Sequence, residues 1–416
     1  MARPKKPNVL LVALRSIGIA RILILSALGL VGAWFAAALA ISGVARIKAP
    51  QAALMVMPKE STALASRADQ LFFANPKNPP REVELLARRG LESQAINAKA
   101  LRILGYVTDA KGDNETAEKY VRMAAKLSRR EPGAQLWLVE ASARKGDIAQ
   151  TLVHYDIALR TKPDTQTILF PRLIAAIEDP EIRVALKPYI RADNGWAPAF
   201  LYFANANSKN LPALVELIIE TGGLIDEESA KSQELGLLGR LVAENYFADA
   251  RRLYLQMPGA KPVRLTSTAF DASDRDARFG PMGWQLLEDP DAGGGFTGNG
   301  GNGQTKLAIY ANSATTRPVA SKLLYLTPGK YLFAARLANL DRGDGGFLRW
   351  QLRCPAIGGA PTWTIDSINS SLRAELIVPA NCPVQFLDLI ASGGKGQTGL
   401  EATIASVSVS TAKPSN

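Results

Sequence analysis

The chain has 416 residues, of which 47% are hydrophobic and 21% are charged, and its formal net charge is +11. Much of this charge lies at the N-terminus, because residues 1–49 contain seven Lys and Arg residues and no Asp or Glu. A nucleic-acid-binding protein would gather basic residues on a folded face, so the distribution argues against that class for residues 50–416.

The first predicted element is a transmembrane helix over residues 22–45, which contain no charged residue. At about 1.5 Å per residue, this stretch exceeds the roughly 30 Å apolar core of a bilayer. Basic residues predominate before it, so we expect residues 1–21 in the cytoplasm and the bulk of the chain in the periplasm, as a single-pass protein of a bacterial-type inner membrane. A cleavable signal peptide is the alternative; the length of the apolar run favours an uncleaved anchor.

After a linker at residues 46–59, residues 60–257 show helical spacing of apolar residues. Identical residues recur 34 positions apart: Gly112 and Gly146, Asp113 and Asp147, Leu104 and Leu138, Ala124 and Ala158. This period is typical of tetratricopeptide repeats. A resemblance to that family is carried by Leu101, Leu104, Gly105, Ala117, Val121 and Ala124.

The resemblance implies a TPR-like α-solenoid over residues 60–257, whose groove would bind a protein partner. His154 is the only histidine of the chain, so we expect no His-ligated metal site and no cofactor. We interpret His154 and its neighbour Tyr155 as packing residues rather than groove residues. Lys126, Arg129 and Arg130 form a basic cluster that we interpret as a solvated helix end.

From residue 265 the chain changes to short β-branched and aromatic runs separated by turns, and residues 265–411 are predicted to form a β-sandwich, followed by a tail at 412–416. Strands are expected near residues 284–287, 306–311, 321–326, 331–338, 348–354, 373–378, 385–391 and 403–410. The glycine-rich tract at residues 293–303 and the stretch after Pro361 are predicted to be loops.

The two cysteines, Cys354 and Cys382, both lie in this region. An isolated pair in an exported chain predicts a disulfide, since the spacing matches no zinc pattern. Two free, buried thiols are the alternative.

Residues 326–337 place a Pro-Gly turn before an aromatic strand, and residues 399–409 form a closing strand. These features resemble galactose-binding-like jelly rolls, the fold of several carbohydrate-binding modules. The resemblance implies that exposed aromatic side chains contact sugars. The candidates for ligand binding are Trp363, Trp284, Tyr310 and Tyr325, and for the last three we favour a structural role in the core over ligand binding.

The expected fold class is therefore multidomain α plus β, with a transmembrane helix, a solenoid and a jelly roll. The expected function is that of a non-enzymatic scaffold or adaptor with a glycan-binding module, accessory to the assembly or export of exopolysaccharide or another cell-envelope glycan. One alternative is a carboxylate-dependent enzyme that cleaves glycans. Another is a protein–protein scaffold without a sugar site.

Overall fold

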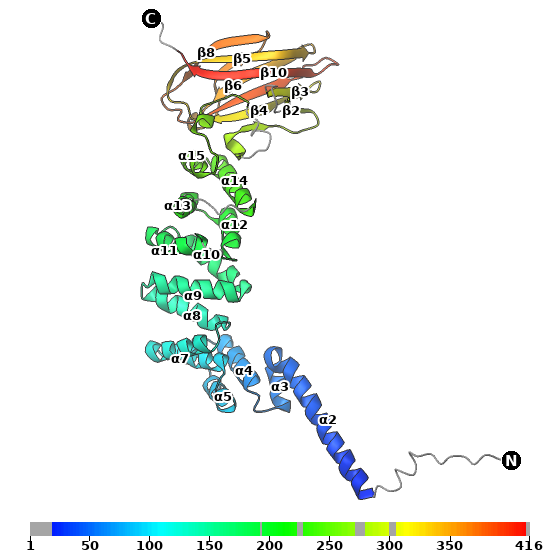
Figure 1. Ribbon diagram of the computed structural model, residues 1–416, viewed down its shortest axis with the longest axis vertical. Coiled ribbons are helices and arrows are strands. Elements are labelled where there is room, and N and C mark those ends of the chain that lie inside the picture. Colours follow the sequence, from blue (N-terminus) through cyan, green and yellow to red (C-terminus); the bar gives the residue numbers. More distant parts are fainter. Residues whose placement is uncertain (1–18, 192–193, 223–227, 271–278, 299–304, 413–416) are drawn as a thin grey trace, which may run out of the picture. The chain divides into compact units, whose positions relative to one another are not determined.

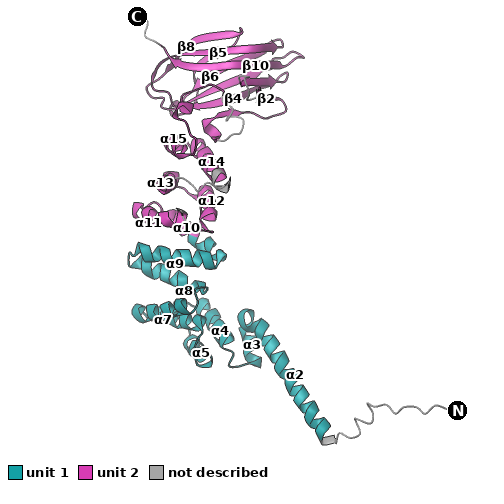
Figure 2. Cartoon of the chain, viewed as in Figure 1, with its two compact units in different colours: residues 1–169 teal, residues 170–416 magenta. Residues whose placement is uncertain are grey.

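The computed structural model describes residues 19–191, 194–222, 228–270, 279–298 and 305–412 (Figure 1). Most of the predicted basic segment at residues 1–21 and most of the predicted tail lie outside these residues. The chain divides into two compact units, Met1–Leu169 and Phe170–Asn416 (Figure 2). The second unit contains helices as well as both sheets, because its helices contact the β region.

The first described helix, α2 (Ile19–Lys48), contains the predicted transmembrane stretch. It is long and apolar enough to cross a membrane, as a single span or as a signal sequence would be. The C-terminal part of α2 packs against α3 (Pro50–Val56) and α4 (Ser61–Ala74), and Ala38 and Ser42 are buried. Most of the large apolar side chains of α2 are exposed.

The other helices of the first unit pack mainly against their neighbours in sequence. They are α5 (Arg81–Ser93), α6 (Ala98–Ala110), α7 (Asn114–Leu127), α8 (Pro132–Arg144) and α9 (Ile148–Thr161), followed by η1 (Pro163–Thr165) and by α10 (Gln166–Ala176), which contains the boundary between the units. Helices α6 and α8 begin and end 34 residues apart, as do α7 and α9. The predicted 34-residue period is therefore present in these two helix pairs.

The turn within each pair explains why Gly and Asp recur. Gly112 and Gly146 have φ angles of 89° and 71°, a region that residues with a side chain rarely adopt. The side chains of Asp113 and Asp147 then cap α7 and α9, and each accepts a hydrogen bond of 3.0 Å from the backbone amide three residues later. Such caps stabilise a helix by about 1 kcal/mol.

Close contact between the helices of a pair depends on Gly105 of α6. A Cβ atom at this position would lie 2.5 Å from Cγ2 of Val121 and 3.1 Å from the carbonyl oxygen of Ala117, both on α7. Only glycine allows α6 and α7 to approach this closely.

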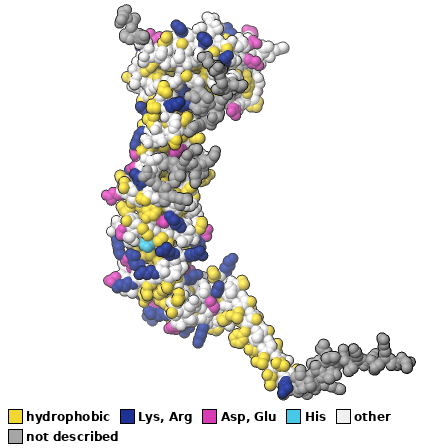
Figure 3. All heavy atoms as spheres, in the orientation of Figure 1, with side chains coloured by type: hydrophobic (Ala, Val, Ile, Leu, Met, Phe, Trp, Pro, Cys, Tyr) yellow, Lys and Arg dark blue, Asp and Glu magenta, His cyan; other side chains and the backbone are white. Residues whose placement is uncertain are grey.

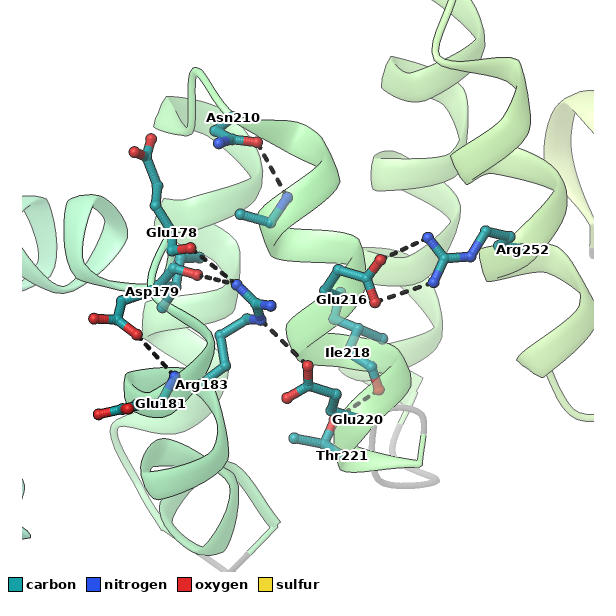
Figure 4. A network of polar contacts seen from close by, with 12 residues as sticks. Glu178, Asp179, Glu181, Arg183, Asn210, Glu216, Ile218, Glu220, Thr221 and Arg252 are labelled. Atoms are coloured by element: carbon teal, nitrogen blue, oxygen red, sulfur yellow. Dashed lines mark hydrogen bonds and ion pairs between the residues drawn. The ribbon is translucent and has the colours of Figure 1, made fainter.

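The second unit begins within α10 and continues through α11 (Pro180–Arg191), α12 (Ala197–Asn207), α13 (Leu211–Thr221), α14 (Glu228–Ala243) and α15 (Phe247–Gln256). Arginine–glutamate contacts connect α11, α13 and α15 (Figure 4). Arg183 is 9% exposed; it donates to the carbonyl oxygen of Ile177 at 2.9 Å and to the Glu220 carboxylate at 3.3 Å. Arg252 binds Glu216 through two hydrogen bonds of 2.6 and 3.0 Å.

The described residues after α15 form ten strands: β1 (Trp284–Leu286), β2 (Ala292–Thr297), β3 (Lys306–Ala311), β4 (Thr316–Leu324), β5 (Gly329–Arg342), β6 (Phe347–Arg353), β7 (Pro361–Asp366), β8 (Ser371–Val378), β9 (Gln385–Ser392) and β10 (Leu400–Thr411). They form two antiparallel sheets with strand orders β1-β4-β9-β6-β7 and β2-β3-β10-β5-β8, which stack as two layers (Figure 1). The eight predicted strands are present.

Two segments that we predicted to be loops are strands. β2 occupies the start of the glycine-rich tract, because its backbone pairs with β3 although three of its residues are glycines. The end of that tract, residues 299–303, lies outside the described residues. β7 begins at Pro361, at the edge of its sheet, where a missing backbone N–H is tolerated.

One hydrophobic core fills the space between the sheets. The Trp350 indole is fully buried there, with its ring centroid 5.4 Å from that of Phe333. The predicted disulfide joins Cys354 and Cys382 at the same core, with a Cα–Cα distance of 5.5 Å. This crosslink is confirmed, so the free-thiol alternative is excluded.

We expect Gly105→Ala to lower the free energy of unfolding by about 1–3 kcal/mol, because the added methyl group overlaps Val121. Urea unfolding followed by far-UV circular dichroism measures this change. The matched control is Gly239→Ala in α14, where a Cβ atom has no neighbour within 4 Å. An equal effect of the two substitutions would contradict the close contact between α6 and α7.

We expect replacement of both cysteines by alanine to lower the free energy of unfolding of the sandwich by about 3–4 kcal/mol, because the bridge closes a long loop in the unfolded chain. Cys354 and Cys382 are separated by 28 residues. Tryptophan fluorescence in guanidinium chloride follows the transition. Addition of a reductant should destabilise the natural chain and leave the double variant unchanged, and the opposite pattern would argue against the crosslink.

Candidate functional site

Trp284 is not available to a ligand at the surface. Its side chain is 3% exposed, and its ring centroid lies 6.3 Å from that of Trp350. The indole Nε1 donates a hydrogen bond of 3.2 Å to the carbonyl oxygen of Thr268. The core role that we favoured for Trp284 therefore holds, and Trp284 is removed from the candidates for ligand binding.

Trp363 is partly buried and packs against the core. On β7 it pairs with Leu352 of β6, and because side chains alternate across a strand, both point toward the space between the sheets. Its ring centroid lies 5.1 Å from that of Phe333, and its Nε1 donates to the carbonyl oxygen of Glu375 at 2.9 Å. Trp363 thus packs at the sheet edge instead of standing in an exposed loop.

Tyr325 lies where the sandwich meets α15, within the second unit. Its hydroxyl donates a hydrogen bond of 2.9 Å to the carbonyl oxygen of Phe247, at the start of that helix. Burial raises the pKa of the Tyr325 phenol, while the nearby Arg251 acts in the opposite direction. The ring of Phe247 packs against Phe386 with centroids 6.1 Å apart. Tyr325 therefore joins helix to sheet and does not form a sugar platform.

Tyr310 is the aromatic candidate that the structure places on an open face. Its side chain is 38% exposed and projects from the outer side of β3, since Leu307, Ile309 and Ala311 point into the core. The hydroxyl donates to the carbonyl oxygen of Asp289. A Cβ atom on Gly293 would lie 3.1 Å from ring atom Cε1, so the ring lies against the β2 backbone.

Strand register places acidic residues beside this ring. Tyr310 pairs with Glu401 of β10, and Glu401 pairs with Asp341 of β5, all three exposed. In the neighbouring row, Thr403 pairs with Asn339. Because adjacent strands lie about 4.8 Å apart, the backbone of Glu401 lies about 5 Å from that of Tyr310 across the sheet, and the backbone of Asp341 about 10 Å. We call these five residues, Tyr310, Glu401, Asp341, Thr403 and Asn339, the Tyr310 face.

The Tyr310 face combines two features that suit a sugar. An aromatic ring covers the apolar face of a pyranose, and carboxylate and amide oxygens accept hydrogen bonds from its hydroxyl groups. The hydrogen bond to Asp289 and the glycine beneath the ring hold the phenol in place before a ligand arrives. We did not identify Glu401, Asp341 or Asn339 from the sequence, because only the strand register brings them to Tyr310.

The other sheet has a polar network on its outer face, but the contacts there are made within the protein. Asp388 of β9 is buried and accepts hydrogen bonds from Ser321 at 2.7 Å, from Gln351 at 3.3 Å and from Arg353. The hydrogen bond to Asp388 raises the pKa of Arg353. A network satisfied in this way stabilises the sheet and leaves few groups for a ligand.

Within the described ranges, no three His, Cys, Asp or Glu residues gather as metal ligands would.

No protein-family model matches the chain, and no curated protein matches it. Among solved structures, the C-terminal β region is similar to carbohydrate-binding modules. A family 61 module in complex with β-1,4-galactotriose is 11% identical, with a TM-score of 0.23, and the match covers 31% of this chain and 88% of that chain.

The xylanase 10B modules of Clostridium thermocellum complexed with xylohexaose are 12% identical, with a TM-score of 0.25, and the match covers 36% of this chain and 29% of that chain. A family 4 module is 14% identical, with a TM-score of 0.21, and the match covers 33% of this chain and 83% of that chain. These TM-scores are too low to indicate a ligand for this chain. The inference about a ligand therefore depends on the residues of the Tyr310 face.

We expect Trp284→Ala to lower the free energy of unfolding of the sandwich by about 3–5 kcal/mol, because it leaves a cavity in the core. Tyr310→Ala should lower it by about 1 kcal/mol or less, because an exposed ring with one hydrogen bond is lost. Parallel denaturant titrations compare the two variants. Similar losses from both would show that Tyr310 is a core residue and not part of an open face.

Proposed function

We propose that this chain is a membrane-anchored scaffold whose sandwich binds a glycan through the Tyr310 face. The observation that carries the proposal is the exposed ring of Tyr310, which lies against Gly293, with Glu401 on the next strand and Asp341 on the strand beyond it. A ring fixed in this way provides a surface for a pyranose without loss of side-chain freedom on binding.

The charges on the face favour a neutral glycan. Glu401 lies on the strand next to Tyr310 and Asp341 on the strand after that, so a carboxylate or sulfate group on a bound sugar would meet two negative charges. Hydroxyl groups, in contrast, donate hydrogen bonds to these carboxylates. We therefore expect neutral polysaccharides to bind more tightly than acidic ones of the same backbone.

We propose binding and not catalysis at this face. Glu401 and Asp341 are exposed on neighbouring strands, and we assign them to the recognition of hydroxyl groups.

The rest of the chain supports a role in the cell envelope. Helix α2 is apolar and follows a basic segment, which favours an anchor with its N-terminus in the cytoplasm. The disulfide between Cys354 and Cys382 suits an oxidising compartment such as the periplasm. The 34-residue period favours a TPR-like solenoid, and stacked pairs of this kind form grooves that bind a protein partner. In this proposal the protein is accessory to exopolysaccharide or envelope-glycan assembly or export.

The test is affinity electrophoresis of the detergent-solubilised chain through gels that contain neutral or acidic polysaccharides. We expect a neutral polysaccharide to retard the chain, and we expect Tyr310→Ala to weaken binding about tenfold, because a stacked ring contributes about 1–1.5 kcal/mol. Glu401→Gln should weaken binding less, since the amide oxygen still accepts a hydrogen bond.

The matched control is Tyr202→Ala, which removes an exposed tyrosine on α12, away from the sandwich. If Tyr310→Ala is folded and binds as the natural chain does, the Tyr310 face is not the site. If no neutral polysaccharide retards the natural chain, the glycan proposal fails.

A further inference from the structure

The helical part of the first unit contains a cavity of about 290 Å³ between α7, α8 and α9. Its polar lining consists of Arg122 and Lys126 of α7, Arg129 in the turn after α7, Gln135 of α8 and His154 of α9. Apolar side chains from all three helices complete the lining. Figure 3 shows the histidine side chain, in cyan, among dark-blue Lys and Arg side chains. This cavity belongs to the helices and is independent of the Tyr310 face.

His154 is buried with one of its ring nitrogens unsatisfied. The side chain is 7% exposed, and its Nδ1 lies 2.8 Å from Oε1 of Gln135. The other nitrogen, Nε2, is buried and has no hydrogen-bond partner in the described part of the chain. Buried polar atoms are nearly always paired in native proteins, so a lone ring nitrogen in a residue that lines a cavity indicates a missing partner.

The charge at this cavity is positive. Arg122 forms an ion pair with Glu118 at 2.8 Å, whereas Lys126 and Arg129 form no ion pair with any described acidic residue. None of the residues that line the cavity is acidic. Three cationic side chains therefore surround one opening, where an anion would gain charge-assisted hydrogen bonds.

We propose that this cavity binds the anionic group, a carboxylate or a phosphate, of a small organic ligand. Lys126 and Arg129 contact the anion, and His154 Nε2 donates a hydrogen bond to it when the ring is protonated. Ala125, Leu138 and Ile157 contact the apolar part of the ligand. The volume is that of a ligand about the size of one monosaccharide. In this proposal Lys126 and Arg129, two residues of the basic cluster that we interpreted as a solvated helix end, belong to the anion-binding site.

The proposal predicts coupling to protonation. Burial, and then the charge of Arg122, lower the pKa of His154, while Asp147 at the start of α9 acts in the opposite direction. Lys126 of α7 and Arg129 in the turn after it also line the cavity, and the uncharged Gln135 of α8 contacts the ring. A bound anion favours the imidazolium and raises the pKa in the complex. Affinity should therefore rise as the pH falls through the pKa of the complex, and be constant above it.

Because the chain has a single histidine, its imidazole carbon signal reports on this cavity alone. We would label the full chain with histidine enriched at Cε1, in a zwitterionic detergent, and follow this NMR signal during titration with glucuronate or inorganic phosphate. Glucose and sodium chloride at matched ionic strength are the controls. We expect a saturable shift with glucuronate or phosphate, an upward move of the His154 titration midpoint, and no such changes with the controls.

The double variant Lys126→Gln/Arg129→Gln should weaken the affinity about tenfold or more, because two charge-assisted contacts are lost. Lys119→Gln is the matched control, since Lys119 lies on the same helix, is exposed and pairs with Glu115 at 2.7 Å. Equal shifts with sodium chloride, or unchanged affinity in the double variant, would overturn the proposal. A shift with polyglutamate but with neither small anion would also overturn it, in favour of an acidic polypeptide.

Discussion

The helical unit depends on the burial of one charge, the guanidinium group of Arg102. This side chain is 3% exposed and forms ion pairs with Asp69 of α4 at 2.8 Å and with Glu131 at 2.7 Å. Burial opposes its charged form, but Tyr106, Asp69 and Glu131 together raise the pKa of Arg102. A buried charge must keep its partners, and these come from different helices, so α4, α6 and α8 are held in one arrangement. Glu131 directly precedes α8, so the same contact positions Gln135 and, through it, the ring of His154.

The two proposed sites arise from different physical causes. At the Tyr310 face, backbone register decides which side chains become neighbours, and a glycine on the next strand leaves room for the ring. At the cavity between α7, α8 and α9, tertiary packing leaves His154 Nε2 without a partner. The first site carries acidic side chains, while the second is lined by basic ones. We therefore assign a neutral glycan to the sandwich and an organic anion to the helices, and neither assignment rests on the other.

The sequence predicted those features that depend on local pattern. The change from helical to β spacing, the 34-residue period and the cysteine pair all appear in the structure, because each leaves a signal in a short window. The surroundings of the four aromatic candidates could not be predicted, for the opposite reason. An aromatic residue on a short strand faces core or solvent according to its pairing, and the sequence does not show that Trp363 pairs with Leu352. Strand β2 has so few side chains that no alternation marks it, and the residues that surround Tyr310 come from strands far apart in sequence.

The central claim is that a glycan binds at the Tyr310 face, and the most direct measurement is a crystal structure of the chain with a bound neutral oligosaccharide. The account predicts a sugar ring against the phenol of Tyr310, with hydroxyl groups donating to Glu401 and Asp341. A sugar bound on the opposite sheet, near Asp388 and Arg353, with solvent over Tyr310, would contradict it.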